Sequence, residues 1–183
     1  MRTLVTGGLA AALAAAALAV APAGAADAEH WLRARGEFAP VGEDGTVPQA
    51  VTYDEALVPA GAEIRVGQRV VGERMVVDLS LGGLVPGHAY GVHVHTDPCG
   101  ADPEAAGPHY RHMESGQPRA ANEVWLDVTA NGDGGATAVA TREWVFRSGG
   151  AGSVVLHEHH SDQDGGAGKR VACFTVPFAG PGE

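Results

Sequence analysis

Basic residues are scarce in this chain of 183 residues. Lysine and arginine together number 12 against 22 aspartates and glutamates, which gives a formal net charge of −10. Nucleic acids and anionic membrane surfaces are themselves negatively charged, so a chain with this balance is poorly suited to bind either of them. We therefore expect neither nucleic acid nor a membrane surface as a partner.

Long apolar runs are also lacking, with one exception at the N-terminus. Arg2 is followed by an alanine- and leucine-rich run over residues 9–20 and by the small residues Ala23-Gly24-Ala25. This order is typical of a secretory signal peptide, and the run is too short to span a membrane. We expect residues 1–25 to be removed near Ala25, leaving a secreted or periplasmic protein without a membrane insertion.

Cysteine is limited to Cys99 and Cys173. Export favours a disulfide between them, because oxidising compartments preserve such bonds. Two free, buried thiols are the alternative. If the bridge forms, the long loop that it closes corresponds to a stabilisation of roughly 4 kcal/mol in the chain-entropy treatment.

A sustained helical period is absent, and short alternating segments separated by glycine-rich turns take its place. Residues 74–81 are the clearest, since Met75, Val77 and Leu79 alternate with less apolar side chains. Seven to eight such strands predict an all-β fold, a Greek-key antiparallel β-barrel or sandwich. The candidate strands are residues 52–53, 62–66, 74–81, 90–95, 123–129, 136–146, 153–157 and 170–176.

The β pattern begins at about residue 51, so we expect one domain over residues 51–183. Residues 26–50 show no clean periodicity and predict a poorly ordered N-terminal arm, with a first strand within residues 31–38 as the alternative. Two long loops interrupt the strands, at residues 96–122 and 158–169. Loops of this length inside a compact β domain usually carry function.

The segment Gly91-Val92-His93-Val94-His95 gives one strand two different faces. Side chains alternate across a strand, so His93 and His95 lie on the same face, opposite Val92 and Val94. Two neighbouring neutral imidazoles suit a transition metal such as copper or zinc. The alternative is a strand face that is merely polar.

Two further histidines can complete a metal site. His157 ends the candidate strand 153–157, on the face opposite Val154 and Leu156, and His109 follows the constrained pair Gly107-Pro108. Four imidazoles without a thiolate are a ligand set that suits Cu(II). We therefore predict a copper site made by His93, His95, His109 and His157.

The order of these motifs resembles the copper-zinc superoxide dismutase family. The segments that carry the resemblance are Gly91-Val92-His93-Val94-His95, Cys99, Ala106-Gly107-Pro108-His109, Val155-Leu156-His157-Glu158 and Gly166-Ala167-Gly168-Lys169-Arg170-Val171-Ala172-Cys173. The resemblance implies a copper-dependent superoxide dismutase with Cys99 paired to Cys173. It also implies that His93, His95, His109 and His157 bind copper, that His109 supplies a proton to the peroxide product, and that Arg170 attracts superoxide.

The chain departs from the family at the zinc site, which normally combines the bridging histidine with two further histidines and an aspartate. After His109 this chain offers His112, and Ala120-Ala121-Asn122-Glu123-Val124 stands where the family has a further histidine and aspartate. Zinc then lacks two of four ligands unless Glu114 or Glu123 takes part. We expect copper without zinc, as in the copper-only bacterial branch.

A second departure is the loop between His157 and Arg170, which is shorter than in the family and contains Lys169 as its only lysine. A short loop predicts an exposed copper and weak focusing of an anionic substrate. The alternative function is therefore a non-catalytic copper-binding or copper-buffering protein on the same fold. The sequence predicts no particular oligomeric state.

Overall fold

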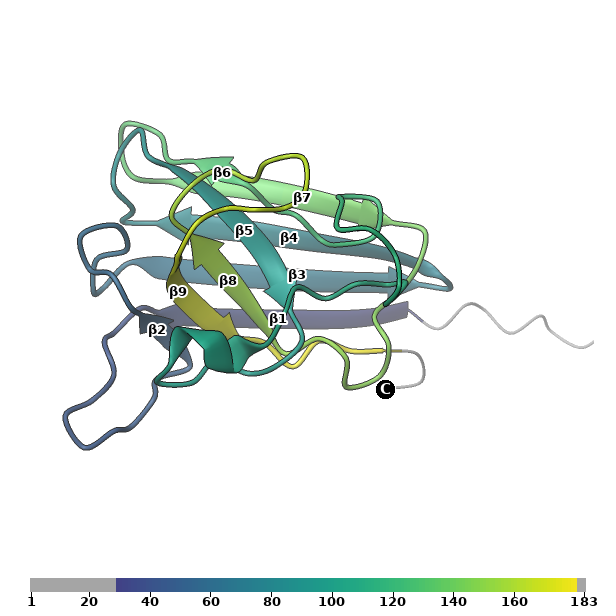
Figure 1. The fold of residues 1–183 in the computed structure, drawn as a ribbon, viewed down its shortest axis with the longest axis horizontal. Coiled ribbons are helices and arrows are strands. Elements are labelled where there is room, and N and C mark those ends of the chain that lie inside the picture. The colour runs from purple at the N-terminus through teal and green to yellow at the C-terminus, as the bar shows by residue number, and fades with distance from the viewer. Residues whose placement is uncertain (1–28, 181–183) are drawn as a thin grey trace, which may run out of the picture.

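Two antiparallel β-sheets packed face to face make up the protein (Figure 1). The structure, a computed structural model, describes residues 29–180, so the predicted signal peptide lies outside the described residues. One sheet has the strand order β1-β3-β4-β7 and the other β2-β9-β8-β5-β6. The elements are β1 (Glu29–Glu37), β2 (Ala50–Thr52), β3 (Glu63–Val71), β4 (Arg74–Gly82), β5 (Ala89–His95), η1 (Pro103–Ala106), β6 (Val128–Thr129), β7 (Ala136–Arg142), β8 (Ser153–His157) and β9 (Arg170–Thr175).

The connections between the sheets follow a Greek-key pattern. The chain leaves the first sheet after β4, returns to it from β6 to β7, and leaves it again from β7 to β8. The predicted all-β Greek-key fold is thus confirmed as a sandwich, and the two sheets do not close into a barrel. No helix within residues 29–180 is long and apolar enough to cross a membrane.

Strand β1 is the largest difference from the sequence-based expectation. Residues 29–37 lie within the predicted arm, yet they pair with β3 along their whole length, so the described chain has nine strands. Leu32 and Ala34 pack against the main core from one face of β1. Gly36 lets the ring of Phe174 approach to 2.8 Å from the position that a Cβ would occupy. Arginines and glutamates on the other face hid this alternation in the sequence.

The core between the sheets positions β5. Tyr90, Val92 and Val94 are at most 1 % exposed and belong to the main core, as the alternation predicted. His93 and His95 therefore face away from that core, toward the two long loops. Here the loop over residues 158–169 covers β5 closely, because a Cβ on Gly91 would lie 2.5 Å from that of Ala167.

A disulfide between Cys99 and Cys173 ties the long loop after β5 to strand β9. This confirms the predicted pairing. The bridge lies in a small second core with Val51, Ala106 and Val155. The loop that carries His109 is thereby fixed to the same sheet that carries the other three histidines.

Replacing both cysteines with serine is expected to lower the free energy of unfolding by roughly 4 kcal/mol, because the bridge spans a sequence separation of 74 residues. Denaturant unfolding followed by circular dichroism measures the change, and the reduced wild-type chain should give a similar value. A loss below about 1 kcal/mol would contradict the constraint assigned to this bridge.

Candidate metal centre

Strands β5 and β8 lie side by side and bring three histidines, His93, His95 and His157, to one face of the five-stranded sheet. In their antiparallel register Gly91 stands opposite His157 and His93 opposite Val155. His109 comes from the loop after β5, which folds back onto that strand through the bridge His95↔His109 and the bond from Tyr110 N to Val94 O, 2.8 Å long. Local pairing therefore places all four histidines that the sequence singled out.

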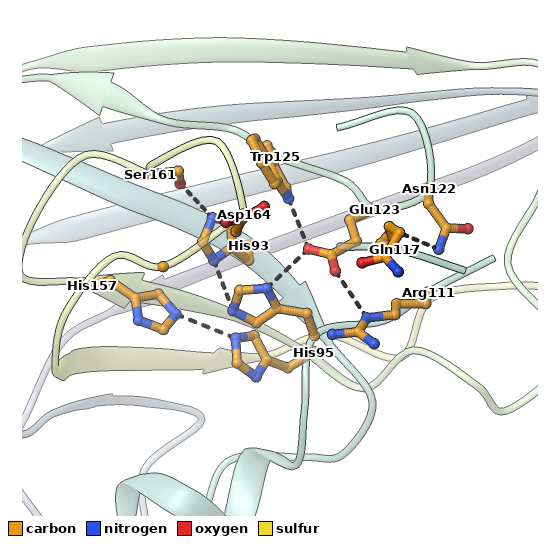
Figure 2. A network of polar contacts seen from close by, with 12 residues as sticks. His93, His95, Arg111, Gln117, Asn122, Glu123, Trp125, His157, Ser161 and Asp164 are labelled. Carbon is orange, nitrogen blue, oxygen red and sulfur yellow. Dashed lines mark hydrogen bonds and ion pairs between the residues drawn. The ribbon is translucent and has the colours of Figure 1, made fainter. Parts of the chain in front are cut away.

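The four imidazole rings converge on one point. One nitrogen of each lies within 4.8 Å of the corresponding nitrogen of the others, and within residues 29–180 no other group of three or more histidines, cysteines or acidic residues is so arranged. The Nδ1 of His93 lies 3.0 Å from the Nε2 of His109, and the Nε2 atoms of His95 and His157 are 3.3 Å apart (Figure 2). These distances fit nitrogens that share one ion.

The second nitrogen of each ring is held by an oxygen of the protein. The Nδ1 of His95 donates to the carbonyl of Gly107 at 2.9 Å, and the Nδ1 of His157 donates to that of Gly168 at 3.3 Å. The Nε2 of His93 lies 2.6 Å from the hydroxyl of Ser161. Such partners fix the tautomer and ring orientation of metal-binding histidines and leave the other nitrogen free as a ligand.

Glu123 holds the outward nitrogen of His109. Its Oε2 accepts from the Nδ1 of His109 at 2.9 Å and from the indole of Trp125 at 2.8 Å, while its Oε1 accepts from Arg111 at 3.1 Å (Figure 2). Burial alone would raise the pKa of Glu123, but these hydrogen bonds and the charge of His109 outweigh it and hold the pKa below its usual value. A buried, ionised carboxylate therefore supports His109.

Asp127 supports the opposite side of the cluster. Its carboxylate accepts from the backbone N–H of Val92 at 3.0 Å and from that of Ser161 at 2.9 Å. It also lies 3.6 Å from the Nε2 of His93. Asp127 thus fixes the beginning of the loop over residues 158–169, where Ser161 holds the ring of His93.

The three histidines on β5 and β8 remain neutral in the metal-free protein. Burial, reinforced by neighbouring imidazoles, lowers the pKa of His93 far below its ordinary range and that of His95 to about 2. Burial also lowers the pKa of His157 to about 4. Neutral imidazole is the form that binds a metal, so these rings need not lose a proton before coordination at neutral pH.

This neutrality predicts that the metal-free protein loses stability as the pH falls. Below about pH 6.5 the unfolded chain protonates these three histidines and the folded chain does not, so the unfolded state binds more protons and the free energy of unfolding decreases. The slope is expected to approach about 1.4 kcal/mol per pH unit for each histidine between pH 6.5 and about 5. This window lies above the pH range in which most carboxylates titrate. Denaturant titrations at several pH values measure it.

The variant His157→Gln provides the internal comparison. It removes one of the three titrating rings, so the slope should fall by about a third over the same window. A slope near zero in the wild-type protein, or one that His157→Gln leaves unchanged, would contradict the assignment of buried neutral imidazoles.

Arg170 lies at the edge of the cluster, opposite His157 in the register of β8 and β9. Its guanidinium donates to the carbonyl of Pro103 at 2.9 Å and lies 3.2 Å from the carboxylate of Glu104. Both partners belong to η1, so this short helix fixes the arginine. Burial and, after it, the neighbouring imidazole of His109 lower the pKa of His95 and of His157, and the charge of Arg170 makes a smaller contribution in the same direction.

Of the three residues named as possible zinc ligands beside His109, His112 and Glu114 lie away from the four converging rings. The ring of His112 stacks on Trp144, with centroids 4.6 Å apart, and Glu114 is an exposed carboxylate 3.3 Å from Arg147. Glu123 does contact His109, but as a hydrogen-bond acceptor.

A groove of about 320 Å³ borders His109 and is lined also by Thr96, Pro108, Arg111, Glu114 and Arg147.

Sequence reasoning missed the residues that support the four histidines. The sequence indicates Glu123 only as a possible zinc ligand and indicates no role for Arg111, Trp125, Asp127 or Ser161. The spacing Glu123-x-Trp125-x-Asp127 was the available signal, since alternate residues of an extended segment share a face. The bridge His93↔Trp125 then brings that segment against β5.

Comparison with known proteins agrees with this geometry. The family profile described as copper/zinc superoxide dismutase matches residues 61–176, well over half of the chain. A solved structure, that of the clock protein EA4, is similar with a TM-score of 0.50 and 24 % identity, and the match covers 62 % of this chain and 85 % of that one; at this identity it supports the fold alone. No curated protein sequence matches. By its profile match, its Greek-key sandwich and its four converging histidines, the chain belongs to the copper/zinc superoxide dismutase family.

Proposed function

We propose that this protein is a secreted, copper-only superoxide dismutase, which converts superoxide to oxygen and hydrogen peroxide with one copper and no zinc. The observation that carries the proposal is which partner each ring nitrogen of His109 has. Its Nε2 faces the other three histidines, and its Nδ1 is bound to Glu123 at 2.9 Å. In a zinc-containing member of the family that second nitrogen binds zinc; here a carboxylate takes it.

The donor set fits copper. His93, His95, His109 and His157 would hold the ion with one nitrogen each, and nitrogen ligands without thiolate suit Cu(II). The oxygens of Ser161, Gly107 and Gly168 and the carboxylate of Glu123 orient these rings before any ion arrives. Bound copper supplies the one-electron chemistry, in which one superoxide is oxidised to oxygen and a second is reduced.

The chain's own residues supply the proton and the approach of the anion. The second superoxide becomes hydrogen peroxide only after it gains two protons. His109 would supply one from Nε2 in the state in which this nitrogen is not bound to copper, with its Nδ1–H still bonded to Glu123, and solvent would supply the other. The negative charge of Glu123 stabilises the imidazolium that this requires. Arg170, always charged, orients the anion beside the cluster.

Arg170 provides the experiment that separates an enzyme from a copper-buffering protein. The purified protein is loaded with one equivalent of copper, and superoxide consumption is measured for wild type and Arg170→Ala, at low and raised salt. Wild type should consume superoxide, and Arg170→Ala should lose about tenfold or more in rate with copper content unchanged, because the local positive charge guides the anion. Copper binding without superoxide consumption would favour a copper-buffering protein instead. The net charge of −10 repels an anionic substrate, which is the reason to test this alternative.

Metal analysis tests the copper-only assignment. After equilibration with both metals, we expect one copper and almost no zinc per chain, since His109 and His112 do not share a site in the way that four-ligand zinc requires. More than about half an equivalent of tightly held zinc would contradict it.

Secretion is supported by the disulfide, because such bonds persist mainly in oxidising compartments. The mature N-terminus is the direct test. Mass spectrometry of the exported protein should show a chain that begins near Ala26. An intact chain that retains residues 1–25 in the cell would contradict this part of the proposal.

A further inference from the structure

Strand β1 leaves one edge of the four-stranded sheet open. It is the outermost strand of the order β1-β3-β4-β7, next to β3 on one side only (Figure 1). The bond from Phe38 N to Ala62 O, 2.8 Å long, continues the register Glu37↔Glu63. Since bonding direction alternates along an antiparallel strand, even-numbered residues of β1 bond to β3, and the N–H and C=O groups of odd-numbered residues point to the open edge.

These edge-pointing groups have no backbone partner within residues 29–180. Strand β1 is nine residues long, well above the usual five to six. A long, unpaired edge is a template for another strand, and proteins that avoid such pairing shorten or interrupt their edge strands. β1 contains neither a proline nor a bulge.

The odd-numbered residues also carry the exposed side chains of β1. They are Glu29, Trp31, Arg33, Arg35 and Glu37. Trp31 is 53 % exposed, and the guanidinium groups of Arg33 and Arg69 lie 5.6 Å and 5.1 Å from its ring centroid. A strand added at this edge would place its own side chains beside this row.

A second copy of β1 fits this row in one antiparallel register. Edge-pointing residues of one copy must pair with edge-pointing residues of the other, so the register between the two strands can change only in steps of two residues. A two-fold axis through Leu32 puts Glu29 opposite Arg35 of the second copy and Trp31 opposite its Arg33. Opposite charges and cation–π contacts between facing residues stabilise paired strands.

The neighbouring registers fit less well. An axis through Arg33 puts Glu29 opposite Glu37 and Arg33 opposite itself, and like charges that face each other destabilise a pair of strands. An axis through Trp31 pairs only residues 29–33 of the described strand. The axis through Leu32 pairs residues 29–35 without a like-charge contact, and it brings together two leucines that already pack against the core.

Charge also favours this face as the contact between two acidic chains. The chain as a whole carries −10. The outer face of β1, β3 and β4 instead presents five arginines against four carboxylates, so two copies that meet here repel each other less than the net charge of the whole chain would suggest. These residues are Arg33, Arg35, Arg65, Arg69 and Arg74, and Glu29, Glu37, Glu63 and Asp78.

We propose that two copies of this chain associate through their β1 strands, antiparallel about a two-fold axis at Leu32, and form one continuous eight-stranded sheet. The contact is isologous, so each copy contributes the same strand and every side-chain pair occurs twice. Glu29 with Arg35 and Trp31 with Arg33 of the other copy set the register. The two metal centres take no part in the contact.

Sedimentation velocity over a range of concentrations tests the proposal on the purified protein. Wild type should show a monomer–dimer equilibrium. Arg35→Glu alone and Glu29→Arg alone should each weaken dimerisation by about tenfold, because each turns two attractive cross-strand pairs into repulsive ones. An equimolar mixture of these two variants should regain wild-type dimerisation, since every Glu then faces an Arg.

Arg65→Glu is the matched control. It makes the same substitution on the same face, on β3 rather than at the edge, and should leave the dimer intact. A monomer at every concentration would overturn the proposal. So would a dimer that Arg35→Glu weakens no more than Arg65→Glu does, or variants whose mixture shows no recovery. Activity is not a readout here, so the outcome is independent of the proposed function.

Discussion

Replacing His95 with glutamine is expected to lower copper affinity by more than about 100-fold and to abolish superoxide consumption. Loss of a residue that merely orients a ligand costs roughly 10- to 100-fold in metal affinity, and His95 contributes a ligand nitrogen itself. Its ring is fully buried beside those of His109 and His157. Titration of the variant with Cu(II) against a competing chelator measures the loss.

His112→Gln is the matched control. It changes the same residue type on the loop that follows β5, but the ring of His112 stacks on Trp144 and is not one of the four that converge. Copper affinity should therefore stay at the wild-type value. Equal copper affinity in His95→Gln and wild type, with the fold shown intact by circular dichroism, would rule out the proposed site.

Replacing Glu123 with glutamine is expected to lower superoxide consumption roughly 10- to 100-fold while copper stays bound. Glutamine is nearly isosteric but carries no charge, so it cannot stabilise a positive His109. Its amide also cannot accept from His109, Trp125 and Arg111 together, since one of its two ends is a donor. Activity and copper content are measured on the same sample across pH.

Glu114→Gln is the control for this change. Glu114 is a carboxylate on the same loop, but it is exposed and pairs with Arg147 rather than with His109. Its replacement should leave activity unchanged. If Glu123→Gln were fully active, or if it lost copper in proportion to activity, the carboxylate would not act through His109 in the way that we propose.

Much of the site was predictable because its signals are local. Alternation alone assigned the faces of His93 and His95, and the core does receive Tyr90, Val92 and Val94. The strand ending at His157 followed the same rule. Glycine and proline before His109 marked a constrained turn, and the structure does bring His109 against β5 at this point.

The parts that sequence did not predict depend on contacts between distant segments. Glu123 acts on His109 because the extended segment over residues 123–127 pairs with β5, although only residues 128–129 form a regular strand there. Ser161 reaches His93 across a separation of 68 residues. No local pattern encodes which of several polar side chains will end beside a buried imidazole.

The sequence favours a poorly ordered arm over strand β1 for a different reason, although a first strand within residues 31–38, the alternative, is what the structure contains. One of its faces is only half buried and the other alternates positive and negative charge, so its apolar periodicity is weak. Pairing with β3 decides its conformation, and that partner lies about 35 residues further along the chain. Tertiary pairing often overrides a weak local preference in strands.

The central claim is that four imidazoles, those of His93, His95, His109 and His157, share a single copper. Electron paramagnetic resonance of the protein loaded with one equivalent of Cu(II) tests it directly, because nitrogen ligands split the copper signal. We expect a single tetragonal copper species with coupling to three or four nitrogens, and a simpler pattern in His157→Gln. Several species, or a spectrum dominated by oxygen ligands and unchanged in that variant, would contradict the claim.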